Sequence, residues 1–169
     1  MKTITKILAT SAAVVALFFT TNANAQSTPK LGIGLNVGVP TQTNGSVAIG
    51  GDVRYQFDID KQLSIPVTAG YTNISYKNSI ASSGYIPVKV GAKYFFNDTG
   101  AGVYGLAEVG AAFNTGSETG TSLVYSPALG YAWSNGLDLG VKYEGKSKSS
   151  NSVISTGYVG LRLAYGFTL

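Results

Sequence analysis

The chain has 169 residues, of which 44% are hydrophobic and only 12% are charged, whereas soluble domains carry about 25% charged residues. After the first 25 residues, no segment reaches the ~20 consecutive apolar residues that a membrane-spanning helix requires. The sequence holds no Cys and no His, which excludes disulfides, zinc-thiolate sites, thiol nucleophiles and Ser-His-Asp catalysis. The side chains that remain as candidates for catalysis are carboxylates, Lys and Tyr.

The first 25 residues are predicted to be a secretory signal peptide. Two lysines give a basic start, residues 7–19 form an apolar core, and Ala23 and Ala25 place small residues where a signal peptidase reads. Cleavage is expected between Ala25 and Gln26, with an uncleaved N-terminal anchor as the alternative. Cleavage lowers the net charge from +4 to +2, so the isoelectric point near 9.2 does not indicate nucleic-acid binding.

From residue 31 onward, apolar residues recur with a period of two, which is typical of half-buried β-strands. In the first strand, for example, Ile33, Leu35 and Val37 alternate with Gly and Asn. The pattern predicts one β-domain over residues 26–169. Its eight predicted strands are residues 31–39, 46–57, 63–71, 86–96, 103–113, 123–133, 137–143 and 159–169.

The charged residues of these strands all lie in the register opposite the large apolar residues. They are Asp52, Arg54, Asp58, Lys89, Lys93, Glu108, Asp138, Lys142, Glu144 and Arg162. Gly, Ala and Ser crowd the same face, and small and charged residues fit the tight interior of an eight-stranded barrel, whereas large apolar residues suit a surface that faces lipid. A closed barrel also satisfies its own backbone hydrogen bonds in lipid. The sequence therefore predicts an all-β fold, an eight-stranded antiparallel up-and-down transmembrane β-barrel.

The connections between the predicted strands alternate between short and longer segments. The short ones are residues 58–62, 97–102 and 134–136, and the longer ones are residues 40–45, 72–84, 114–121 and 145–152. Outer-membrane barrels have short periplasmic turns and longer outward loops. We therefore expect both chain termini and the short turns to lie in the periplasm.

Aromatic residues gather at the strand ends. Next to the short turns they are Tyr55, Phe57, Tyr94, Phe96, Tyr131, Trp133, Tyr165 and Phe167, and near the longer loops they are Tyr71, Phe113, Tyr125 and Tyr143. Two such groups are expected to form aromatic belts at the two membrane interfaces. Ordinary enrichment of aromatic residues in strands is the alternative.

Two segments resemble the small bacterial outer-membrane β-barrel family, the OmpA-like and OmpX-like eight-stranded barrels of Gram-negative bacteria. They are residues 86–96, IPVKVGAKYFF, and the closing run 160–167, GLRLAYGF. The closing run resembles the C-terminal signal read by the barrel assembly machinery, although this chain ends in Leu169 where the family usually ends in an aromatic residue. The resemblance covers residues 31–169. It implies an integral outer-membrane protein whose partners are membrane lipid, lipopolysaccharide and the assembly machinery.

The inward charges are expected to form a salt-bridge network that fills the barrel, since unpaired charges there would be costly. Glu108 is the candidate central acid, with a basic residue such as Arg162 as its nearest expected partner, and the pairs that meet depend on the shear of the barrel. A narrow or gated ion path is the alternative, because the five basic and five acidic residues could also line a passage. Lys142, Lys146 and Lys148 form a small basic group that either is solvated or contacts lipopolysaccharide phosphates.

Residues 140–147 match the phosphate-binding pattern GxxxxGKS, but that chemistry needs a turn between a strand and a helix, and here a strand continues. The sequence therefore favours a non-enzymatic membrane barrel with no cofactor or metal, in which the loops meet any extracellular ligand. A porin-like channel for small solutes is the alternative. Two further alternatives are an outer-membrane enzyme that uses carboxylates and a soluble lipocalin-like barrel. The soluble barrel requires the opposite arrangement, with the large apolar residues inside and the charged residues outside.

Overall fold

The computed structural model describes residues 29–77, 82–115, 120–148 and 152–169. Residues 1–28, with the predicted signal peptide and its cleavage site, lie outside the described residues. In the described part of the chain, no helix has the length and apolar character needed to cross a membrane.

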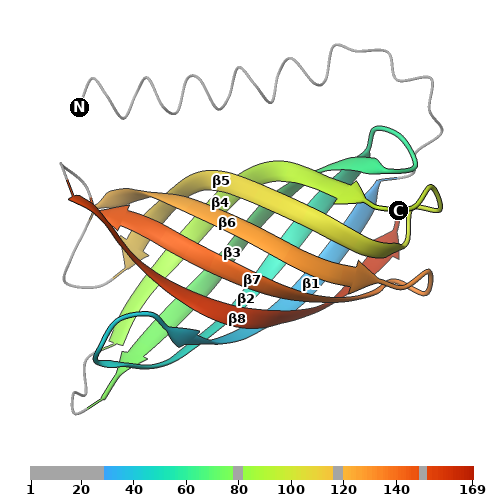
Figure 1. Cartoon of the computed structure of the whole chain (residues 1–169). Helices are drawn as coiled ribbons and strands as arrows, with labels where there is room; N and C mark the ends of the chain where they lie inside the picture. The colour runs from blue at the N-terminus through green and yellow to red at the C-terminus, as the bar shows by residue number, and fades with distance from the viewer. Residues whose placement is uncertain (1–28, 78–81, 116–119, 149–151) are drawn as a thin grey trace, which may run out of the picture.

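The described residues form eight strands that close into one barrel (Figure 1). The strands are β1 Lys30–Pro40, β2 Gly45–Asp58, β3 Leu63–Tyr76, β4 Ser82–Phe95, β5 Gly102–Thr115, β6 Thr121–Ala132, β7 Leu137–Lys148 and β8 Ser152–Thr168. Each strand pairs antiparallel with the next, and β8 pairs with β1, for example at Leu35↔Leu163. The predicted up-and-down barrel is confirmed, and closure leaves no sheet edge unpaired.

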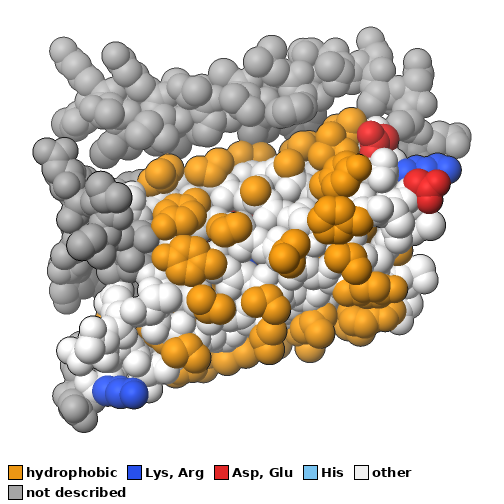
Figure 2. All heavy atoms as spheres, in the orientation of Figure 1, with side chains coloured by type: hydrophobic (Ala, Val, Ile, Leu, Met, Phe, Trp, Pro, Cys, Tyr) orange, Lys and Arg blue, Asp and Glu red, His pale blue; other side chains and the backbone are white. Residues whose placement is uncertain are grey.

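The large apolar side chains point outward, as the period-two pattern predicted. Leu35, in the middle of β1, is 69% exposed, and Leu129 of β6 is 63% exposed. In Figure 2 apolar side chains cover the middle of the visible face, and charged side chains appear only at its two ends. An exposed apolar band of this kind is what a lipid-facing surface requires.

Strand length at one end differs from the prediction. The hairpin of β3 and β4 continues to Ser75↔Ser82, although the apolar alternation in the sequence stops at Tyr71. The hairpin of β7 and β8 likewise reaches Lys148↔Ser152. Most of the residues predicted as long loops therefore extend the strands. The outward residues of the β3 extension, Asn73 and Ser75, are polar, and its apolar Ile74 points inward. The outward apolar alternation therefore does not continue into the extension.

Two ends of the barrel can thus be distinguished. At the turn end lie the two chain ends of the barrel and the short connections 59–62, 96–101 and 133–136. At the other end, here called the hairpin end, β1, β3, β5 and β7 end and β2, β4, β6 and β8 begin.

Two buried apolar clusters fill parts of the interior. Toward the hairpin end lie Ala48, Ile74, Tyr85, Ala112, Val124 and Tyr158. Toward the turn end lie Phe95, Tyr104 and Leu106. The charged residues occupy the space between and beside these clusters, so the interior is packed with side chains, as expected for eight strands.

Candidate functional site

The candidate site is the charged interior of the barrel. Nine charged side chains are buried there, each with at most 8% of its surface exposed: Asp52, Arg54, Lys89, Lys93, Glu108, Asp138, Lys142, Glu144 and Arg162. Strand alternation places them inside, because each shares its register with the small residues of its strand. Asp58, the tenth predicted member, lies at the turn end and is only partly buried, with its carboxylate 2.9 Å from Lys30 Nζ.

Glu108 lies in the centre of the first group of ion pairs. Its carboxylate is 3.3 Å from Arg54 Nη2 and 3.4 Å from Lys89 Nζ, and it accepts a 2.6 Å hydrogen bond from the Thr68 hydroxyl. The expected pairing of Glu108 with Arg162 is wrong. Arg162 instead lies 2.6 Å from Asp52, because β8 is next to β1 and its guanidinium reaches across β1 to β2.

Glu144 extends this first group toward the hairpin end. Its Oε2 atom is 2.7 Å from Lys89 Nζ and 3.2 Å from Lys142 Nζ. Its Oε1 atom accepts a 2.7 Å hydrogen bond from the Tyr85 hydroxyl. Arg54, Glu108, Lys89, Glu144 and Lys142 therefore form one continuous chain of alternating charge.

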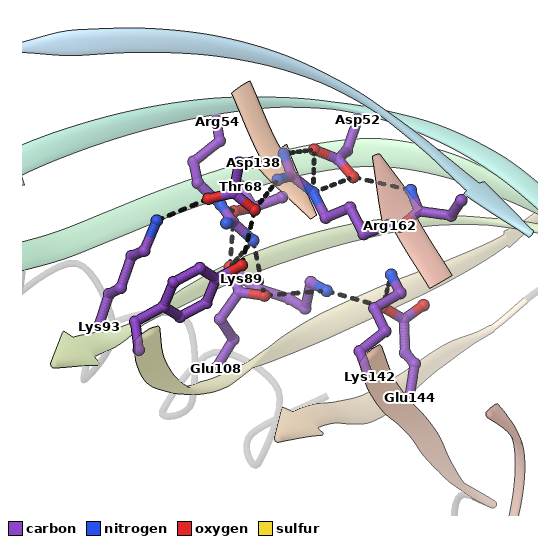
Figure 3. A network of polar contacts seen from close by, with 12 residues as sticks. Asp52, Arg54, Thr68, Lys89, Lys93, Glu108, Asp138, Lys142, Glu144 and Arg162 are labelled. Atoms are coloured by element: carbon purple, nitrogen blue, oxygen red, sulfur yellow. Dashed lines mark hydrogen bonds and ion pairs between the residues drawn. The ribbon is translucent and has the colours of Figure 1, made fainter. Parts of the chain in front are cut away.

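A second chain of ion pairs lies toward the turn end. Arg162 joins Asp52 and Asp138, the latter at 3.7 Å, and Lys93 Nζ lies 2.7 Å from the other oxygen of Asp138. Asp138 also accepts a 2.6 Å hydrogen bond from the Tyr104 hydroxyl. Figure 3 shows the two chains side by side, with side chains from strands on opposite walls meeting in the middle.

Glycines on the inner face make room for this network. A Cβ atom on Gly34 would lie 2.7 Å from Arg162 Nη2, so Gly34 lets the guanidinium lie flat against β1. A Cβ atom on Gly130 would collide with the Tyr104 hydroxyl, which reaches Asp138 across β6. The small residues seen in the sequence therefore serve the large inward side chains.

The interior is hollow near the turn end. A cavity of about 490 Å³, here called the vestibule, extends from residues 99–101 and 133–136 at the rim to Arg54, Lys93, Asp138 and Arg162 at its floor. Lys30 and Gln56 lie on its wall. Toward the hairpin end Tyr85, Val124 and Tyr158 are at most 2% exposed and fill the barrel.

Comparison with known proteins decides the family. The model of the outer membrane protein beta-barrel domain matches residues 10–167, which is nearly the whole chain. The chain belongs to the outer-membrane protein β-barrel family. No curated protein sequence matches it.

Solved structures agree with this family at the level of the fold. The N-terminal barrel domain of Pseudomonas aeruginosa OprF is 14% identical at a TM-score of 0.59 and covers 84% of this chain and 100% of its own. Yersinia pestis Ail, in complex with the heparin analogue sucrose octasulfate, is 16% identical at a TM-score of 0.57, covering 85% and 100%. Neisserial surface protein A is 14% identical at a TM-score of 0.54, covering 85% and 98%.

As a member of this family, the protein is an integral protein of the bacterial outer membrane. The predicted aromatic residues lie on its outer surface at the turn end, where Tyr94, Phe96, Tyr131, Trp133, Tyr165 and Phe167 are 40–61% exposed and Tyr55 and Phe57 are partly buried. They contact one another in pairs along single strands, as in Tyr55–Phe57 and Tyr131–Trp133, with ring centroids 4.6 and 4.7 Å apart. Near the hairpin end, the rings of Tyr125 and Tyr143 are 5.9 Å apart.

The predicted basic group near the loops does not exist as one surface. Lys142 is buried in the interior beside Glu144, because it shares the inward register of β7. Lys146 Nζ donates a 2.8 Å hydrogen bond to Asn114 Oδ1, and the side chain of Lys148 lies outside the described residues. The residues that match the phosphate-binding pattern all lie within β7, so they form no phosphate loop.

Sequence reasoning missed the inward aromatic residues. Phe95, Tyr85, Tyr104 and Tyr158 are at most 2% exposed and share the face of the charged residues. These aromatic residues occupy the alternate strand positions that the charged residues share, whereas the belt residues occupy the other positions. This register in the sequence is the signal that would have identified them as inward. In the described part of the chain, no three acidic residues gather in a way that could hold a metal ion.

Proposed function

We propose that this barrel has a structural and surface-interaction role in the outer membrane, without enzymatic activity. The observation that carries the proposal is the filled interior: buried rings and paired charges occupy the half toward the hairpin end. Each buried carboxylate lies within 3.5 Å of a basic group, so its charge is already compensated by an ion pair inside the barrel. A barrel closed in this way offers its ends and its surface for interaction.

Planar-bilayer recording tests the filled interior. The wild-type protein is expected to give no stable conductance steps, because Tyr85, Tyr158 and the Glu144 group close the hairpin half. The variant Tyr85→Ala with Tyr158→Ala is the opened control, and it should conduct if it keeps its fold. Steady conductance by the wild-type protein would contradict the proposal.

A narrow channel for small solutes is the second candidate, and the vestibule favours it. This cavity already reaches from the turn end to Arg54 and Arg162 in the interior. Conduction then requires only that the side chains toward the hairpin end move. The same recording decides between the two candidates.

We further propose that the turn end faces the periplasm and that residues 1–25 are removed during export. Both termini of the barrel lie at the turn end, as expected after transport across the inner membrane (Figure 1). N-terminal sequencing of the protein from outer membranes should begin at Gln26. A sequence that begins before residue 20 would contradict the predicted cleavage.

The hairpin ends are the proposed contact surface for lipopolysaccharide or an extracellular ligand. The polar extensions of β3, β4, β7 and β8 carry them beyond the apolar band, and Lys77 is exposed at this end. Replacing Lys77 by Gln should weaken the stabilisation of the barrel by lipopolysaccharide. Lys61→Gln, at the turn end, is the matched control.

The closing strand is the proposed contact of the barrel assembly machinery. Leu161, Leu163, Tyr165 and Phe167 alternate along β8 and are 46–51% exposed. Phe167→Ser should slow assembly, which can be followed by the appearance of heat-modifiable protein in the membrane. An unchanged rate would argue against this contact.

A further inference from the structure

The charged residues that line the vestibule at the turn end are mostly basic. Its lining includes four basic residues, Lys30, Arg54, Lys93 and Arg162, but only one acidic residue, Asp138. The carboxylates of Asp52, Glu108 and Asp58 pair with Arg162, Arg54 and Lys30 without lining the cavity. The solvent side of this cavity is therefore basic.

The buried charges inside the barrel do not cancel. Of the nine fully buried charged side chains in the described part of the chain, five are basic and four are acidic. An uncompensated buried charge is strongly destabilising, because it loses the hydration it would have in water. The interior therefore has the charge that one bound anion would neutralise.

Arg54 at the vestibule floor shows where the missing contact lies. Its Nε donates to the Thr68 hydroxyl at 3.1 Å and its Nη2 lies 3.3 Å from Glu108, but its buried Nη1 has no hydrogen-bond partner. The residue is only 5% exposed. A buried guanidinium nitrogen without an acceptor is uncommon and calls for a ligand or ion.

We propose that the vestibule binds a small oxyanion, the phosphate or carboxylate group of a soluble molecule, with Arg54, Lys93 and Arg162 as the cationic contacts. A guanidinium presents planar pairs of donors that match such groups, and Lys93 adds a point charge. The anion takes the place of the missing acceptor at Arg54 and balances the fifth positive charge. Because Tyr85 and Tyr158 close the barrel beyond the network, the ligand enters and leaves only at the turn end.

This inference goes beyond the proposed structural role and does not depend on it. A barrel that carries no current can still bind an anion in a cavity with one opening. Conversely, the failure of anion binding leaves the filled interior unchanged.

Isothermal titration calorimetry on the full mature chain in a nonionic maltoside detergent tests the proposal. Sodium phosphate and sodium acetate are titrated separately at constant ionic strength, and the detergent contributes no phosphate group. We expect one saturable site, and Arg54→Gln should weaken its affinity at least 10-fold. Lys61→Gln changes an exposed lysine of the 59–62 turn outside the vestibule, and it should bind like the wild type.

Heat-modifiable migration on gels checks that each variant is folded. If Arg54→Gln does not fold, Lys93→Met is the second variant, since Asp138 keeps its contacts with Tyr104 and Arg162. The absence of saturable binding to the wild type, or equal binding by a folded Arg54→Gln or Lys93→Met variant, would overturn the proposal. Binding found only in vesicles of phosphatidylglycerol would also overturn it, because the ligand would then be a lipid headgroup.

Discussion

Glu108 shows how a single carboxylate can hold the barrel together. It joins Arg54 from β2, Lys89 from β4 and Thr68 from β3, so its side chain connects three strands other than its own. These contacts are buried, because each partner is at most 5% exposed. Its loss should therefore leave two basic groups without their shared counter-charge.

The variant Glu108→Gln is expected to lower the free energy of unfolding by about 3–5 kcal/mol, the usual cost of leaving a buried charge without its partner. Urea unfolding in lipid vesicles, followed by far-UV circular dichroism, measures this change. Asp58→Asn is the matched control. It removes a carboxylate from the Lys30 pair, which is partly exposed, and should cost at most about 1 kcal/mol. Equal effects of the two variants would contradict this role of Glu108.

Gly34 offers a second test at the residue scale. A Cβ atom there would lie 2.7–2.9 Å from three atoms of the Arg162 guanidinium, whereas a Cβ atom on Gly32 would have its nearest neighbour at 3.6 Å. Gly34→Ala should displace Arg162 from Asp52 and cost about 1.5–3 kcal/mol, the range for hydrogen bonds to charged groups. Gly32→Ala, on the same strand and face, should stay within about 0.5 kcal/mol of the wild type. The same urea measurement compares them, and a Gly34→Ala variant as stable as Gly32→Ala would refute the argument.

At the scale of the strand, the backbones of β4 and β5 approach closely where inward glycines lie. A Cβ atom on Gly110 would collide with the carbonyl oxygen of Val88 on β4, and a Cβ atom on Gly91 would collide with that of Ala107 on β5. A carbonyl oxygen cannot move aside as a side chain can. Glycine at these two positions therefore follows from strand pairing.

Gly110→Ala should force β4 and β5 apart locally. We expect faster hydrogen exchange at the backbone amides of residues 88–92 and 107–111 and a lower yield of folded, heat-modifiable protein. Gly105→Ala, on the outer face of β5, is the control, because its Cβ atom would have only ordinary contacts at 3.7 Å or more. Unchanged exchange in Gly110→Ala would show that the sheet accommodates the methyl group.

The elements also show what the sequence could and could not predict. Strand number, strand pairing and the inward direction of the nine buried charged residues follow from alternation, because the inner and outer faces differ in polarity along the whole apolar band. The ends of β3 and β7 could not be predicted, since the outward residues Asn73 and Ser75 of β3 are polar and its apolar Ile74 points inward. The ion-pair partners could not be predicted either. The partners depend on how far neighbouring strands are shifted along one another around the barrel. In this barrel, that shift brings Arg162 next to Asp52 and not next to Glu108.

At the scale of the molecule, the outer surface must face lipid around the whole barrel. The most exposed large apolar residue is Leu35, in the middle of β1. Leu35→Lys should destabilise the inserted barrel by about 2–4 kcal/mol, the cost of a lysine near the bilayer midplane. Ser134→Lys, in a short turn, should cost at most about 1 kcal/mol. Unfolding from lipid vesicles measures both, and equal costs would place Leu35 outside the membrane.

The account rests most directly on which face of the strands meets lipid. Because the sequence has no Cys, single cysteines can be introduced along β6 and spin-labelled without first removing native cysteines. In lipid vesicles, labels at residues 123, 129 and 131 should be accessible to dissolved oxygen but not to a water-soluble nickel complex, whereas labels at residues 124, 126 and 128 should be shielded from oxygen. The opposite alternation, or access of the nickel complex to residues 123, 129 and 131, would contradict a lipid-facing outer surface and a filled interior.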